Sequence, residues 1–264
     1  MRYNEASAGG GDTTTTLSPQ RGVIILRGDL VMSEYEEPYN ATPSDKRRIV
    51  KDWQGQFPGF HIKGNSMLKI HLPVCVGICI YYGSSSYMYV PTFFINNLAT
   101  SHYGALNVCQ RCSEPPSMSD WWIYVTEHDK MLKPASGWLM ENFETFLSER
   151  PIFLSEIMCA FWKCLKVGGY SETNVLKDLA YICGYFSRND EADNYIGAAV
   201  DIINTYSSFD QKSVLTWDNV NSVSEWETKM RNECSSPDLL HARVKQRIAD
   251  AKLDKIPNRP LIVD

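Results

Sequence analysis

The sequence predicts an α+β fold, in which an antiparallel β-rich N-terminal half packs with a helical C-terminal half. Two patterns carry this prediction. Between about residues 57 and 127 the apolar residues alternate with the period of two that is typical of strands, and after residue 133 they recur at helical spacing. The composition, with 44% hydrophobic and 22% charged residues among 264, excludes a wholly disordered chain and a multi-pass membrane protein.

The chain divides into four predicted parts. Residues 1–20 are small and polar, so we expect a flexible arm with nothing to bury. Residues 21–133 are predicted to form the β-rich region with one short helix, residues 134–256 the helical region, and residues 257–264 a tail that is either loose or docked in extended form. The start of the chain lacks the apolar stretch of a signal peptide, so secretion is not expected.

The short helix is predicted to begin near Ser44, a residue type that caps helix N-termini, after a strand or hairpin over residues 22–32. Its basic residues admit a structural interpretation, a solvated face opposite an apolar stripe, and a functional one, which is either a patch that faces phosphate or lipid or a short nuclear-import signal. These candidate residues for binding an anionic surface are Lys46, Arg47, Arg48 and Lys51.

The β-rich region is predicted to hold one long strand over residues 67–82, with Pro73 marking an edge or a bulge. Strand-like pieces follow at residues 87–90 and 92–95, and the last strand is expected at residues 121–125. The tyrosines of this region lack basic neighbours, which favours a core or a protein–protein interface over stacking on nucleic-acid bases. They are Tyr81, Tyr82, Tyr87 and Tyr89.

The helical region is expected to begin after Lys133-Pro134 with an apolar stripe that ends at Leu147. Further helices are predicted from Pro151, from Ser171 and around residues 196–203 and 223–230. A last helix opens at Ser236 with proline at its first position, and its basic residues are expected on a solvated face. Those residues are Arg243, Lys245, Arg247, Lys252 and Lys255.

No nucleophile elbow, P-loop, dinucleotide fingerprint or HExxH motif occurs in the sequence. Cys109 and Cys112 form the one CxxC pair and are weak metal candidates, because their spacing to His102 and His128 matches no common zinc module. The eight cysteines are expected to be reduced. No cofactor is predicted. A catalytic site that forms only in the fold stays open; it would need a cysteine or carboxylate close to one of the histidines His61, His71, His102 or His128.

The order of elements between residues 22 and 169 resembles that of rhabdovirus matrix proteins. The resemblance rests on Pro38-Tyr39, on Trp53 at the end of the short helix, on the turn at Gly83-Ser84-Ser85, on Trp121-Trp122 and on Ser136-Gly137-Trp138. The length and the basic cluster are similar to those of the longer matrix proteins of plant-infecting, nuclear-replicating relatives. The resemblance implies a virion protein that self-associates, condenses the nucleocapsid and links it to envelope lipid.

The sequence is therefore interpreted as a non-enzymatic viral structural protein of the virion and the host cell interior, in the cytoplasm or nucleus. Its expected partners are itself, through the arm over residues 1–20, the viral nucleocapsid, and an anionic membrane surface. RNA stays open as a partner, although a net charge of −5 does not imply it. The alternatives are a viral RNA-binding accessory protein, such as a movement factor or silencing suppressor, and an enzyme whose site forms only in the fold.

Overall fold

The computed structural model describes residues 39–83, 86–100, 108–111, 122–164 and 172–264, with the backbone alone at residues 108–111 and 164. The predicted arm over residues 1–20 and the strand or hairpin over residues 22–32 lie outside the described residues. Within them the fold is α+β: an antiparallel sheet in the first half and mostly helices in the second, which confirms the predicted class.

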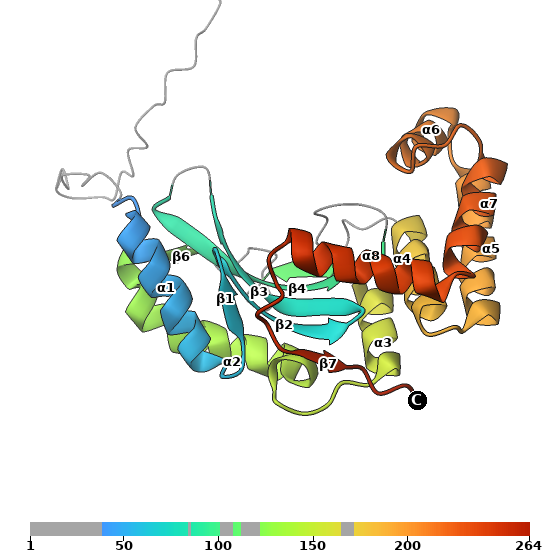
Figure 1. Cartoon of the computed structure of the whole chain (residues 1–264). Helices are drawn as coiled ribbons and strands as arrows, with labels where there is room; N and C mark the ends of the chain where they lie inside the picture. The colour runs from blue at the N-terminus through green and yellow to red at the C-terminus, as the bar shows by residue number, and fades with distance from the viewer. Residues whose placement is uncertain (1–38, 84–85, 101–107, 112–121, 165–171) are drawn as a thin grey trace, which may run out of the picture. The chain divides into compact units, whose positions relative to one another are not determined.

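The sheet of the described residues has the strand order β1-β2-β3-β4-β5 (Figure 1). Neighbours along this path are antiparallel, β6 pairs with β4, and β7 pairs in parallel with β2. The strands are β1 (His61–Lys63), β2 (Ser66–Leu72), β3 (Val74–Tyr82), β4 (Met88–Asn97), β5 (Val108–Arg111), β6 (Ile123–Tyr124) and β7 (Asn258–Pro260).

Helices cover both faces of this sheet, so two apolar clusters form, one on each side. The first cluster joins one face to α1, α2 and α3, and the second joins the other face to α4–α8; α4 contributes to both. The helices are α1 (Pro43–Gln56), α2 (His128–Leu147, after the 3-10 turn η1, Val125–Glu127), α3 (Leu154–Cys164), α4 (Glu172–Tyr185), α5 (Asn189–Thr205), α6 (Ser208–Trp217), α7 (Val223–Cys234) and α8 (Pro237–Asp250).

The single strand predicted over residues 67–82 is wrong, because the chain reverses at Pro73 and forms the hairpin of β2 and β3. His71 pairs with Val74 across this turn, so even-numbered residues change faces there. Leu68 and Ile70 belong to the second cluster, whereas the even-numbered residues of β3 belong to the first. Since both faces are buried, the alternation in sequence is uninterrupted, and it hides the turn.

Three other boundaries differ from the prediction. Thr42, rather than Ser44, caps α1, because its side chain and that of Asp45 form a reciprocal capping box. The two pieces around Pro91 form the one strand β4, where Pro91 lies between the pairings with β6 and β5 and needs no N–H donor for either. The helix α2 begins at His128 and contains Pro134, so helical structure starts earlier than expected.

The tail is docked in extended form, one of the two predicted outcomes. β7 pairs with β2, and the N–H of Ile262 donates to the carbonyl of Ile152 over 3.0 Å. The Asp264 carboxylate accepts the N–H of Ser155 at the start of α3 over 3.1 Å. None of the helices in the described ranges is long and apolar enough to cross a lipid bilayer.

Candidate functional site: an aromatic sheet end beside a basic helix

The N-terminus of α1 is held by local hydrogen bonds. The Asp45 carboxylate accepts the Thr42 N–H over 2.9 Å and the Tyr39 hydroxyl over 2.7 Å. The Thr42 hydroxyl also donates to this carboxylate. The hydrogen bonds from the Thr42 hydroxyl, the Tyr39 hydroxyl and the Thr42 N–H, in that order of effect, lower the pKa of Asp45 to about 2. The first turn of α1 is therefore ordered at its exposed end, and the helix presents its basic residues from a defined position.

The four predicted basic residues divide into two pairs in the structure. Lys46 donates to the Ser86 hydroxyl over 3.0 Å and lies 4.8 Å from the centre of the Tyr82 ring. The Arg48 guanidinium lies 2.8 Å from Asp129, on α2. These two cations already serve internal contacts.

Arg47 and Lys51 form the second pair. Both are exposed, and within the described part of the chain the structure gives neither of them an ion pair. They lie four residues apart, so their side chains share one face of α1. Of the predicted set, these two are therefore the cations that remain available to an external anion.

Four aromatic side chains gather where β3 ends and β4 and β6 begin, and we name Tyr81, Tyr87, Trp122 and Tyr124 the aromatic sheet end. The Tyr81 and Trp122 rings meet edge to face with centres 6.2 Å apart, and the Tyr87 and Tyr124 rings stack at 6.0 Å. Tyr81 is 49% exposed and Tyr124 48%. Rings that pack on one another yet keep half of their surface in water are typical of a contact surface.

The basic helix and the aromatic sheet end adjoin each other. The N–H of Ala41, just before α1, donates to the carbonyl of Ser86 over 2.9 Å, and Lys46 contacts the Ser86 side chain. Ser86 directly precedes Tyr87, whose carbonyl accepts the N–H of Val125 over 2.9 Å. The start of α1 is thus fastened to the segment that carries the exposed rings.

A buried polar network, which the sequence did not reveal, joins α1 to α2. The His128 ring is 1% exposed, and its Nδ1 lies 2.6 Å from the Tyr89 hydroxyl while its Nε2 lies 3.3 Å from Asp52. The Trp53 indole N–H donates to the same Tyr89 oxygen over 3.3 Å. Burial lowers the pKa of His128, so the neutral ring is favoured and both of its nitrogens are satisfied.

The ligand atoms of Asp52, His128 and Asp129 all lie within 4.8 Å of one another, as in a site for a divalent cation. However, Arg48 lies 2.8 Å from Asp129 and 3.5 Å from Asp52, so its guanidinium already supplies the positive charge there. The arrangement therefore fits an internal bridge between α1 and α2. Asp52 is 76 residues from His128 in the chain, and no spacing rule in sequence could have joined them.

The other predicted candidates are not brought into this network. His61 lies in β1 and His71 in β2, where His71 is buried with Nδ1 unpaired among the described residues. Cys109 lies in β5 with its side chain outside the described atoms, and Cys112 and His102 lie outside the described residues. Every cysteine whose side chain is described is a free thiol: Cys75, Cys79, Cys159, Cys183 and Cys234.

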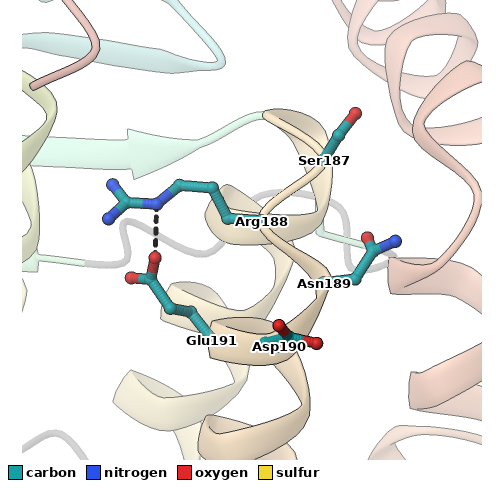
Figure 2. Close-up of a pocket in the computed structure, with 5 residues that line it drawn as sticks. All are labelled: Ser187, Arg188, Asn189, Asp190 and Glu191. Atoms are coloured by element: carbon teal, nitrogen blue, oxygen red, sulfur yellow. Dashed lines mark hydrogen bonds and ion pairs between the residues drawn. The ribbon is translucent and has the colours of Figure 1, made fainter.

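Surface hollows occur at two places among the described residues of the helical half. The first lies at the turn between α4 and α5, and Figure 2 shows Arg188 and Glu191 facing each other there, 2.5 Å apart. Arg188 is the one cation that lines this hollow, and Glu191 neutralises it. The second lies along α6 between Phe209 and Trp217 and is lined mainly by apolar surface.

Comparison with protein family models, with curated proteins and with solved structures gives no match to this chain.

Proposed function

We propose that this chain is a non-enzymatic assembly protein that self-associates through its aromatic sheet end and contacts an acidic surface through α1. The observation that carries the proposal is that the start of α1, the helix that carries Arg47 and Lys51, is hydrogen-bonded to Ser86, next to the exposed rings. A matrix protein that condenses a viral nucleocapsid and links it to membrane needs both surfaces on one subunit, which agrees with the resemblance in element order.

The aromatic sheet end suits association because tyrosine and tryptophan are enriched at the centres of protein interfaces. Their rings are rigid and lose little conformational freedom when they are covered. A second copy that covered Tyr81 and Tyr124 would remove apolar ring surface from water. The predicted contact of the arm over residues 1–20 with a neighbouring subunit adds to this surface in the proposal.

The charge on α1 explains why association and surface binding belong together. Each basic residue near an anionic membrane contributes about 1 kcal/mol, so Arg47 and Lys51 of a single copy bind weakly. An array of copies adds these contributions, and its avidity exceeds that of one subunit by orders of magnitude. We therefore expect surface binding that depends on assembly.

The enzyme alternative finds its strongest support in the Tyr89–His128–Asp52 network, a histidine oriented by two partners. Its ring is 1% exposed and both nitrogens are occupied, so it has no position for a substrate atom in this structure. An RNA-binding accessory protein would use the same basic face, and the choice between RNA and an anionic membrane is left to experiment.

The acidic contact is tested by cosedimentation with vesicles that contain phosphatidylserine, and by filter binding of single- and double-stranded RNA. The variant Arg47→Gln/Lys51→Gln should bind vesicles at least tenfold more weakly, with a shallower salt dependence. The matched control Lys245→Gln/Lys255→Gln removes two exposed charges elsewhere and should bind as the wild type does. Equal binding by both variants would refute the assignment to α1, and strong RNA binding without vesicle binding would favour the accessory protein.

Self-association is tested by light scattering across protein concentration and salt. The wild type should grow beyond a dimer as concentration rises, and Tyr81→Ser/Tyr124→Ser should shift that growth to at least tenfold higher concentration. A wild type that stays monomeric under all conditions would overturn the proposal.

A further inference from the structure

The helix α6 exposes more aromatic surface than any other described element. Phe209 is 80% and Trp217 70% exposed, the highest values among the large hydrophobic side chains of the described residues. Leu215 is the one buried residue of this helix, and α6 packs against α5 (Figure 1). The helix therefore contributes little to the core and much to the surface.

Five exposed residues of α6 line one surface hollow, and we name Phe209, Lys212, Ser213, Thr216 and Trp217 the α6 stripe. Phe209, Ser213 and Trp217 recur at intervals of four residues, which places the two rings about 12 Å apart along the axis with the small Ser213 midway. The pattern aromatic–small–aromatic is the same when it is read in either direction along the helix.

The stripe is held in place from both ends. At the N-terminus the Ser207 hydroxyl accepts the N–H of Asp210 over 3.2 Å. At the C-terminus the buried Asp218 accepts from the Trp226 indole over 2.7 Å and pairs with Lys177 over 3.1 Å. These contacts anchor the residue next to Trp217 to α4 and α7, so the exposed rings are presented by a positioned helix.

We propose that the α6 stripe binds the α6 stripe of a second copy in antiparallel orientation, about a two-fold axis near Ser213. This inference rests on the proposed self-association and supplies a second contact for it. In such a pair the Phe209 ring of one copy lies beside the Trp217 ring of the other, and the two Ser213 residues allow the helices to approach closely. Asp210 offsets Lys212 within α6 as a whole, but Lys212 is the one charged residue of the α6 stripe itself, so the pairing should weaken at low salt.

The surface available for this contact fits a weak, repeated interaction. One phenylalanine and one tryptophan bury roughly 300 to 400 Å² per copy, whereas a stable dimer of standard size buries about 800 Å² per partner. The α6 contact would therefore be transient by itself. Together with the aromatic sheet end it gives each subunit two separate two-fold contacts, and subunits with two such contacts extend into chains or rings instead of stopping at a dimer.

Disulfide trapping tests the pairing directly in the full-length protein. Under mild oxidation Ser213→Cys should form a covalent dimer at least tenfold faster than Ser224→Cys, an exposed serine on α7, with the wild type as the background for native thiols such as Cys159. When Phe209→Ser and Trp217→Ser are added to Ser213→Cys, the covalent dimer should form no faster than it does with Ser224→Cys. Equal rates for the two cysteine variants would overturn the proposal.

Light scattering separates this inference from the proposed function. At concentrations where the wild type grows beyond a dimer, Phe209→Ser/Trp217→Ser should remain a dimer held by the aromatic sheet end. At the same concentrations Tyr81→Ser/Tyr124→Ser should remain a dimer that Ser213→Cys traps. One outcome would support the α6 pairing and refute the sheet-end contact: Ser213→Cys still forms the covalent dimer, while Tyr81→Ser/Tyr124→Ser grows into oligomers as the wild type does. A stripe variant that grows as the wild type does but loses vesicle binding would identify α6 as a lipid contact and overturn the pairing.

Discussion

The two ends of the sheet differ in how deeply their side chains are buried. At the end where β4 finishes, which we name the closed end, Asn97 is fully buried and donates to the carbonyl of Asp178 over 3.0 Å. Arg247 of α8 is also buried there and donates to the Asn97 carbonyl over 3.1 Å. At the other end, the aromatic sheet end, Tyr81 and Tyr124 keep about half of their surface in water.

This difference separates residues that stabilise the fold from residues that we propose to contact a partner. Polar groups at the closed end find their hydrogen-bond partners inside the molecule, so their loss would leave buried groups unsatisfied. Tyr81 and Tyr124 of the aromatic sheet end keep about half of their surface in water, so their loss should change the surface more than the core. Substitutions at the two ends should therefore differ in what they impair.

The largest effect is expected at the closed end. Asn97→Ala removes the donor to Asp178 and the acceptor of the Ala99 N–H, so buried polar groups lose their partners beside a new cavity. The free energy of unfolding, measured by urea denaturation, should fall by about 3 kcal/mol. Asn96→Ala is the matched control, because the Asn96 side chain is partly exposed. It should lower the free energy of unfolding by at most about 1 kcal/mol, which is the effect of an ordinary surface substitution. Equal losses would show that Asn97 does not anchor this end.

Acid should weaken the closed end by a smaller amount. Burial, together with the charges of Lys69 and Arg259, lowers the pKa of His71 in β2 from 6.5 to about 4. Between pH 6.5 and about 4, His71 is protonated in the unfolded chain but neutral in the folded chain. The stabilisation present above pH 6.5 is therefore lost as the pH falls toward 4. Between pH 7 and pH 5.5 this histidine should cost about 1 kcal/mol of unfolding free energy.

Urea denaturation at these two pH values, compared between the wild type and His71→Leu, checks the expectation. The variant keeps a side chain of similar size but cannot titrate, so its decrease in stability between the two pH values should be smaller by that amount. An unchanged decrease would mean that other groups, such as the buried His128, carry the acid sensitivity.

The sequence predicts the two halves of this fold because helical and strand periods differ clearly, and it places the N-terminus of α8 because Ser236-Pro237 is a strong local signal. It does not predict the reversal at Pro73, because both faces of the sheet are buried and the alternation continues through the turn. It also misses α6, whose one buried residue, Leu215, leaves no apolar periodicity to detect.

The basic residues show where local patterns stop being informative. Arg247 and Arg243 were expected on a solvated face, but Arg247 is buried and Arg243 donates to the carbonyl of Ala99 over 3.0 Å. Lys46 and Arg48 likewise serve internal contacts. A cation's partners depend on which carbonyls and carboxylates the fold brings near, and those come from segments distant in the chain. The structure therefore narrows the candidate anion-binding set to Arg47 and Lys51.

The smallest effect on stability is expected at the aromatic sheet end. Tyr81→Ser and Tyr124→Ser should each change the free energy of unfolding by only about 0.5 kcal/mol, because half of each ring is already in water. Tyr89→Ser, at a fully buried ring of the neighbouring strand β4, is the contrasting variant and should cost several times more. A loss at Tyr81 or Tyr124 as large as that of Asn97→Ala would show that these rings belong to the core. A small loss, combined with impaired association, means that the exposed rings contribute to contact between subunits and little to the stability of one.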